Sequence, residues 1–201
     1  MKKTIICLLI LLITTVLMAD LDEIYSNVIT HYRGISTFQA ELTQENYWKE
    51  IDINKTSQGM IYYNADSLRI SYSEPDKQQL YVLGNDILIY EPANSQAIWM
   101  DKGDFKIKPV EIMISYWENS EVALISQSGD LAVISLTSSE ETIEIVIDNN
   151  FIKSVRVADK AGNYVNYTFA AELYNKSLPA ETFIPQLPRE TNVIDNRIGG
   201  R

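Results

Sequence analysis

The sequence predicts a mainly β (α+β) fold, in which a single curved antiparallel sheet of about eleven strands forms an unclosed barrel. An N-terminal helix and a short lid helix are expected to cover this sheet. A helical apolar period opens the chain, alternating strands with short turns fill most of the rest, and a proline-led helical segment interrupts them. Because a sheet this long twists and curls, we expect an incomplete barrel rather than a flat sheet.

The first 19 residues are predicted to be a signal peptide. Lys2 and Lys3 precede an apolar run that ends at Met18, and Ala19 is the expected cleavage position before Asp20. An uncleaved membrane anchor is the alternative, although the run is shorter than the ~20 residues of a typical span. Residues 20–201 are then expected to form one domain.

Composition and charge narrow the classes of function. Cys7 is the single cysteine and lies within the predicted signal peptide, so the mature chain should contain no disulfide, cysteine nucleophile or thiolate metal site. Without Lys2 and Lys3, the mature chain has 15 Lys and Arg against 27 Asp and Glu, a net charge of about −12. This charge argues against nucleic acid as a partner and suits a soluble monomer.

The first predicted helix follows Asp20, which can cap it, and ends before Gly34. Its apolar residues recur at i, i+3, i+4, i+7, i+8 and i+11, which places them on one face over three turns. These residues are Leu21, Ile24, Tyr25, Val28, Ile29 and Tyr32.

After Gly34 the apolar period changes to that of strands joined by short turns. The predicted strands are residues 38–48, 59–64, 67–73, 79–83, 87–91, 95–100, 121–127, 131–138, 142–148, 151–159 and 163–173. The segment 108–119 differs, because Pro109 suits the first turn of a helix and the apolar residues after it have helical spacing. It is therefore predicted to be the lid helix.

Sequence motifs for catalysis or cofactor binding are lacking. His31 is the single histidine and lies beside the apolar stripe of the first helix, so no Ser-His-Asp triad or multi-histidine metal site can be assembled around it. The glycines form no phosphate-binding loop. We therefore expect a protein that is not an enzyme and has no metal or cofactor.

The large apolar side chains of the early strands suggest a cavity. In residues 67–73, Leu68, Ile70 and Tyr72 share one face of the strand. Two helices are too few to cover the whole sheet, so a lipid or acyl-chain cavity is expected, with an ordinary packed core as the alternative. The predicted wall comprises Tyr62, Leu68, Ile70, Tyr72, Leu80, Val82, Leu88, Tyr90 and Trp99, and the predicted lid contacts are Met113, Ile114 and Trp117.

The order of several motifs resembles the periplasmic lipoprotein carrier family LolA over nearly the whole mature chain. The central match is an Arg-x-x-Tyr strand, a Pro-Asp-x-Gln turn, a glycine hairpin and Tyr-x-Pro, here Arg69–Tyr72, Pro75–Gln78, Gly84 and Tyr90–Pro92. Further matching positions are Phe38, Gln39, Ala40, Thr43, Gln44, Gly59, Gln96, Phe183, Pro185, Pro188, Val193 and Asp195.

This resemblance implies a periplasmic chaperone that binds the acyl chains of triacylated lipoproteins and carries them from the inner to the outer membrane. Its implied partners are an inner-membrane ABC transporter complex and, where one exists, an outer-membrane receptor. One departure concerns the turn before the Arg-x-x-Tyr strand, where the family usually has Arg-Pro and this chain has Asn64, Ala65 and Asp66. That arginine is tied to lid closure in the family, so lid control should differ here.

Other functions on the same fold stay open. The main alternative is a periplasmic module that senses lipids or lipoproteins in regulation or envelope assembly. A receptor version would need a lipid-modified N-terminal cysteine, whereas position 20 is aspartate. A structural role in the envelope is a further alternative.

Overall fold

A computed structural model describes residues 21–198 except 104, 105 and 107. The predicted signal peptide and the capping residue Asp20 lie outside the described residues. The helices are α2 (Leu21–Arg33) and α3 (Pro109–Trp117), with 3-10 turns η1 (Pro92–Asn94) and η2 (Ala180–Phe183). No helix of the described segments is both long and apolar enough to cross a membrane.

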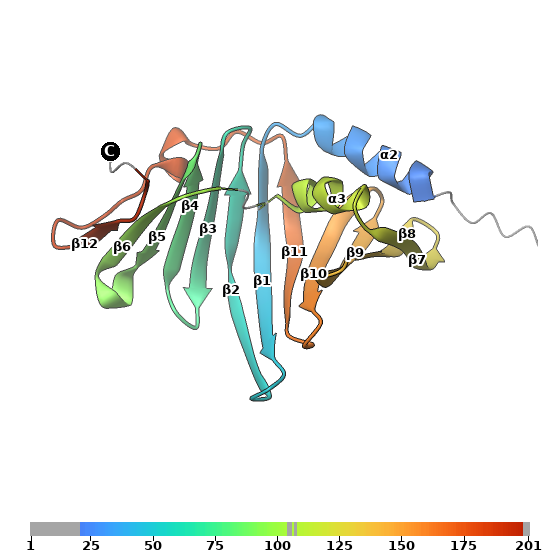
Figure 1. The fold of residues 1–201 in the computed structure, drawn as a ribbon. Coiled ribbons are helices and arrows are strands. Elements are labelled where there is room, and N and C mark those ends of the chain that lie inside the picture. Colours follow the sequence, from blue (N-terminus) through green and yellow to red (C-terminus); the bar gives the residue numbers. More distant parts are fainter. Residues whose placement is uncertain (1–20, 104–105, 107, 199–201) are drawn as a thin grey trace, which may run out of the picture.

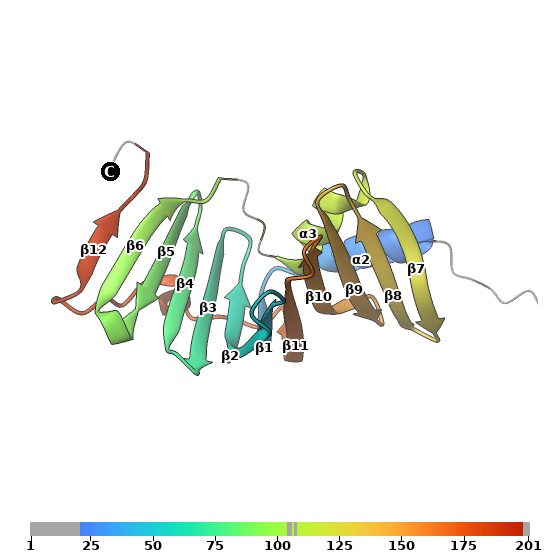
Figure 2. The same ribbon diagram turned by 60° about the horizontal axis from the view of Figure 1, so that its bottom comes forward.

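The described strands form one twelve-stranded sheet that does not close into a barrel (Figures 1 and 2). Their order across the sheet is β12-β6-β5-β4-β3-β2-β1-β11-β10-β9-β8-β7, so β12 and β7 are its edges. The strands are β1 (Phe38–Trp48), β2 (Ile53–Tyr63), β3 (Ser67–Glu74), β4 (Gln78–Leu83), β5 (Asp86–Glu91), β6 (Gln96–Asp101), β7 (Glu121–Ser128), β8 (Leu131–Thr137), β9 (Glu141–Asp148), β10 (Phe151–Asp159), β11 (Tyr164–Tyr174) and β12 (Asn192–Asp195).

The predicted unclosed sheet with two helices is confirmed, and two details are corrected. Strand β2 begins at Ile53, earlier than the expected residue 59, because polar residues continue its pairing with β1. Strand β12 was not expected, and it pairs with β6 in parallel, which makes the sheet mixed. All four residues of β12 are exposed, so main-chain pairing rather than an apolar pattern forms this strand.

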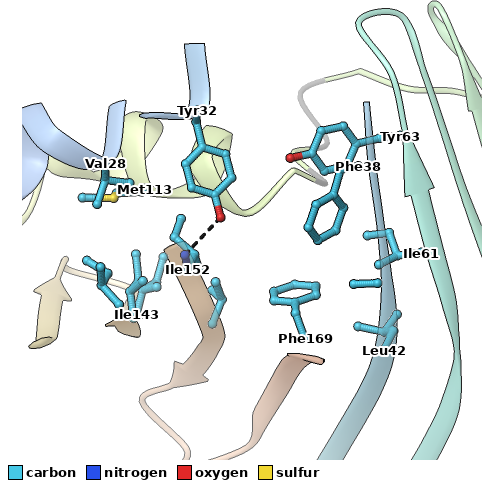
Figure 3. Packing of buried hydrophobic residues seen from close by; sticks show 14 of the residues in the cluster. Val28, Tyr32, Phe38, Leu42, Ile61, Tyr63, Met113, Ile143, Ile152 and Phe169 are labelled. Atoms are coloured by element: carbon cyan, nitrogen blue, oxygen red, sulfur yellow. Dashed lines mark hydrogen bonds between the residues drawn. The ribbon is translucent and has the colours of Figure 1, made fainter. Parts of the chain in front are cut away.

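Strands β1 and β11 join two halves of the sheet. We call β7–β11 the covered half, because α2 and α3 lie over its inner face (Figure 1). We call β2–β6 the open half. The helices and the covered half share a core in which Val28, Met113 and Ile143 have no exposed surface. The main-chain N–H of Ile152 also donates a hydrogen bond to the Tyr32 hydroxyl, 3.0 Å away, which fastens α2 to β10 (Figure 3).

A C-terminal belt, residues 175–191, crosses the outer face of the open half, on the side away from α2 and α3, and leads into β12 (Figure 1). Arg69 donates a hydrogen bond to the carbonyl of Thr182 over 3.3 Å, and Leu187 packs against a buried outer cluster. This outer cluster consists of Tyr81, Leu88, Tyr90 and Ala97. The belt therefore gives the open half a second, smaller core on its outer face.

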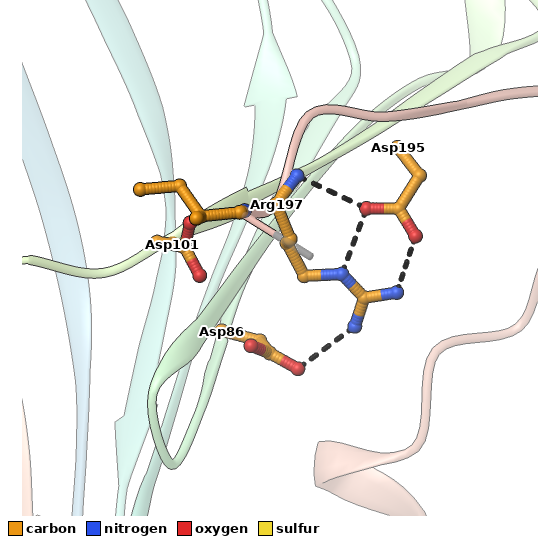
Figure 4. A network of polar contacts seen from close by, with 5 residues as sticks. Asp86, Asp101, Asp195 and Arg197 are labelled. Carbon is orange, nitrogen blue, oxygen red and sulfur yellow. Dashed lines mark hydrogen bonds and ion pairs between the residues drawn. The ribbon is translucent and has the colours of Figure 1, made fainter. Parts of the chain in front are cut away.

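The residues that follow β12 are fixed by Arg197. Its guanidinium pairs with Asp195 over 2.6 Å and with Asp86 of β5 over 2.8 Å (Figure 4). It also lies over the ring of Trp99, 4.9 Å from the ring centre. Hydrogen bonds from Arg197 lower the pKa of Asp195 to about 2, so this carboxylate stays charged at ordinary pH.

Gly59 lies where β2 and β3 approach each other closely. A Cβ at this position would come within 2.3 Å of the carbonyl oxygen of Ser71, which is closer than any side chain can lie. The β2–β3 register also shifts between Gln58 and Gly59. Glycine is therefore required at this irregularity in the sheet.

Candidate functional site

An apolar pocket of about 420 Å³ lies between α3 and the strands where the two halves meet. This volume is within the range of about 300–1,000 Å³ that is usual for small-ligand sites. The strand residues that line it are Leu42, Ile61, Ile70, Tyr72, Leu80, Val155, Val157, Val165, Tyr167 and Phe169. Because side chains alternate along each strand, these residues all point to the inner face of the sheet.

Helix α3 closes one side of the pocket. Pro109, Ile112 and Tyr116 line it from positions i, i+3 and i+7, which lie on one face of a helix. Exposed Lys106, which precedes the helix, also contributes to the lining. Ile114 faces away from the pocket and is 44% exposed. The helix thus presents one apolar face to the pocket and another apolar residue to solvent.

Three polar and aromatic contacts hold α3 in place in addition to the burial of Met113 in the core. Trp117 stacks on Tyr25 of α2, with ring centres 4.4 Å apart. The Tyr116 hydroxyl donates a hydrogen bond to the carboxylate of Glu141 on β9. This bond to an anionic acceptor is the main cause that raises the pKa of Tyr116 to about 12, so the hydroxyl keeps its proton at neutral pH.

The third contact involves the turn that lacks the arginine expected from the family resemblance. Lys108, at the start of α3, donates a hydrogen bond over 3.0 Å to the carbonyl of Ala65 in that turn. Its ammonium group also lies 5.4 Å from the centre of the Tyr63 ring and 3.8 Å from the carboxylate of Glu111. In this chain the positively charged side chain that links α3 to the turn at residues 64–66 is therefore Lys108, at the start of α3.

The structure brings part of the predicted wall together at the pocket. Ile70, Tyr72 and Leu80 line it directly. Leu68, Val82 and Met113 belong to the adjoining inner core, and Trp117 packs against that core beside α2. Whether any of these residues contacts an acyl chain stays a prediction.

Five predicted residues lie away from the pocket. Besides Ile114, these are Tyr62, Leu88, Tyr90 and Trp99, which the structure places on the outer face. The β4–β5 register pairs Leu80 with Ile89 and Val82 with Ile87, so Ile87 and Ile89 are the inner-face residues of β5. Both alternating sets of β5 are apolar because the belt covers the outer face, and the sequence pattern alone could not distinguish them.

Sequence reasoning missed the pocket wall contributed by β1, β2, β10 and β11. On β10 and β11 this wall is formed by Val155, Val157, Val165, Tyr167 and Phe169. Their alternation was visible in the sequence, but their closeness to Ile70 and Tyr72 depends on the β1–β11 pairing. That pairing joins segments more than 100 residues apart, and no local signal specifies it.

The chemistry of the pocket suits binding of an apolar ligand. Its wall is aliphatic and aromatic, and burial raises the pKa values of Tyr72 and Tyr167, so both hydroxyls are neutral. Within residues 21–198 as described, no group of three His, Cys, Asp or Glu side chains could hold a metal ion. Each CH₂ group of a ligand buried here would contribute about 0.8 kcal/mol to binding.

Comparisons with known proteins identify the family and the fold. A family model described as outer membrane lipoprotein carrier protein LolA matches residues 33–186. Among curated proteins, none matches the sequence significantly. The fold is similar to that of an uncharacterized conserved protein from Thermus thermophilus, with a TM-score of 0.58 and 10% identity over 87% of this chain and 98% of the other.

Two further solved structures are more distant. A LolA superfamily protein from Nitrosomonas europaea has a TM-score of 0.46 and 12% identity, over 82% of this chain and 97% of its own. The lipoprotein LppX from Mycobacterium tuberculosis has a TM-score of 0.47 and 8% identity, over 80% of this chain and 99% of its own.

Proposed function

Because the chain belongs to the LolA family of outer membrane lipoprotein carrier proteins, we propose that it binds lipoproteins by enclosing acyl chains in the apolar pocket beneath α3. It acts as a carrier rather than an enzyme. The observation that carries this proposal is the pocket of about 420 Å³, whose aliphatic and aromatic wall excludes water from a bound chain.

The proposed carrier works in the periplasm, after removal of residues 1–19. It receives triacylated lipoproteins from an inner-membrane ABC transporter complex and delivers them to the outer membrane, to a receptor where one exists. Since burial of a long acyl chain is strongly favourable, release requires that the pocket can open. Helix α3 is the movable wall in this proposal, because it is a short helix that closes one side of the pocket.

A pair of substitutions in α3 tests the proposal. Ile112→Glu places a charge in the pocket wall, whereas Ile114→Glu places the same charge two residues further along, on the solvent side. Binding of a fluorescent triacylated lipopeptide is measured by titration, and circular dichroism checks the fold of both variants. We expect Ile112→Glu to weaken binding at least about tenfold, because a charge is costly in an apolar site.

Ile114→Glu serves as the matched control and should bind like the wild type. Equal affinities for all three proteins would contradict the proposed site. Native mass spectrometry of the protein purified from a periplasm gives an independent test, since a bound acylated species would identify the cargo by its mass. A wild-type protein that stays free of ligand when offered the lipopeptide would contradict the proposed function itself.

A further inference from the structure

A polar groove of about 620 Å³ continues from the apolar pocket along the inner face of the sheet. Tyr72, Leu80 and Tyr167 line both spaces, so the two form one continuous site. At the boundary, the Tyr72 hydroxyl donates a hydrogen bond to the side-chain carbonyl of Gln44, which lies in the groove. The ring of Tyr72 thus belongs to the apolar wall, and its hydroxyl marks where polar contacts begin.

The groove lies at the end of the sheet away from α3. Its lining includes Lys77 and η1, which belong to the β3–β4 and β5–β6 connections, and Trp48, which precedes the β1–β2 connection. Figure 1 shows these connections together at the rim opposite α3. Trp48 is 41% exposed there. A ligand with one apolar and one polar end would therefore lie with its apolar end under α3 and its polar end toward this rim.

The uncharged lining of the groove suits a peptide. It comprises the amides of Gln44, Asn46, Gln78 and Asn94 and the hydroxyl of Ser57. Such side chains both donate and accept hydrogen bonds, as the N–H and C=O groups of a peptide backbone do. In the described part of the chain, the Ser57 hydroxyl and the Asn46 side-chain nitrogen make no hydrogen bond, so both are available to a ligand.

The charges of the groove favour a peptide over a phosphate head group. Two lysines and two acids line it, and Lys55 is paired with Asp76 over 2.9 Å. Glu91 accepts hydrogen bonds from Gln78 and Asn94 over 3.1 and 2.9 Å. The lining is therefore electrically balanced on a chain with a formal net charge of −10, which offers no excess of positive charge to a phosphate.

We propose that this groove binds the peptide segment adjoining the acylated end of a lipoprotein, while the acyl chain occupies the apolar pocket. The inference rests on the proposed function and adds the orientation in which the lipoprotein lies in the site. The peptide leaves the site at the rim formed by Trp48 and η1, so the folded part of the cargo lies beyond that rim and not beside α3.

The test compares two probes with the same acyl chain. One is a synthetic N-palmitoyl tetrapeptide, and the other is monopalmitoylglycerol, whose head is neutral but contains no amide. We expect the wild-type protein to bind the palmitoyl peptide about tenfold more tightly, as one or two additional net hydrogen bonds would provide. Affinities are measured by displacement of a fluorescent fatty acid.

Three variants test whether the groove causes the difference in affinity between the two probes. Ser57→Phe fills the groove, and Asn46→Leu removes an amide at similar size; both should abolish the preference for the peptide, and circular dichroism shows that both variants fold. Thr56→Phe places the same bulk on the exposed outer face of β2 and should keep the preference. Equal binding of both probes by the wild type, or a preference that survives Ser57→Phe, would overturn the inference and leave acyl binding intact. Failure of both probes to bind the wild type would overturn the proposed function as well.

Discussion

The covered and open halves of the sheet present similar aliphatic side chains on their inner faces, yet these side chains are buried to different extents. In the covered half, Ile134, Ile143 and Ile145 have no exposed surface, because α2 and α3 lie over them. In the open half, Leu80 and Ile89 occupy equivalent inner positions and stay partly exposed. The difference shows that the layer above a strand, and not its apolar pattern, decides whether its residues form core or pocket wall.

The open half compensates on its other face. Its outer cluster of Tyr81, Leu88, Tyr90 and Ala97 is buried beneath the C-terminal belt, whereas the outer face of β7 is largely exposed. The open half therefore has buried side chains on both faces, since Leu68, Val82 and Ile87 of its inner face belong to the core beneath the helices. The outer cluster adds packing where inner-face residues such as Leu80 line the pocket instead of packing against a helix.

The strongest test of this comparison truncates one isoleucine in each half. Ile145→Ala should lower the free energy of unfolding by about 2–5 kcal/mol, because it leaves a cavity in a fully packed core. Ile89→Ala, at a partly exposed position on the inner face of β5, should lower it by less than about 1.5 kcal/mol, since neighbours and water can fill the space. Urea unfolding measures both values. Equal losses would mean that the open half is packed as tightly as the covered half.

Removal of one hydroxyl tests how α2 covers its half. Tyr32→Phe leaves the buried N–H of Ile152 without a partner, which should cost about 1–3 kcal/mol. Urea unfolding gives the value, and hydrogen exchange at Ile152 should become faster. An unchanged free energy of unfolding would show that the apolar stripe alone holds α2 on β10.

The raised pKa of Tyr32 predicts that the free energy of unfolding falls at alkaline pH. Burial is the main cause that raises the pKa of Tyr32 to about 12, above its value of about 10 in an unfolded chain. The contribution of the protonated Tyr32 hydroxyl to the free energy of unfolding is therefore fully present below pH 10. It is lost as the pH rises through about 12. The free energy of unfolding, measured between pH 9 and 12, should decline in the wild type and should decline less in Tyr32→Phe. A variant that declines as steeply as the wild type would assign the effect to other tyrosines.

A smaller effect is expected at the belt. Leu187→Ala removes a partly buried side chain from the outer cluster and should cost about 1 kcal/mol, below the range for full burial. Ile184→Ala, in the same belt but 52% exposed, is the control and should change stability little. Equal losses of stability in both variants would show that Leu187 does not stabilise the outer cluster.

The smallest effect concerns the lid. Tyr116→Phe removes the hydrogen bond to Glu141 and should lower the free energy of unfolding by about 0.5–1 kcal/mol, as is usual for a half-exposed hydrogen bond. Hydrogen exchange should become faster in α3 and stay unchanged in β2–β6. Unchanged exchange in α3 would show that Lys108 and Trp117 suffice to hold it.

The sequence by itself determined the local elements of this protein. The stripe that begins at Leu21 predicted α2, Pro109 with its helical spacing predicted α3, and period-two alternation predicted eleven of the strands. It also placed Leu68, Ile70 and Tyr72 together on one face of β3. Each of these features depends on residues close together in the chain, which is why pattern and propensity were enough.

The tertiary structure alone decided which faces are covered and which segments meet. The β1–β11 pairing, which brings Val155 and Tyr167 to the pocket, and the parallel addition of β12 to β6 join distant segments. The outward placement of Leu88, Tyr90 and Trp99 follows from the β4–β6 register and from the belt above them. Alternation separates two faces of a strand but carries no information about which face will be buried, because that depends on the layer that packs against each.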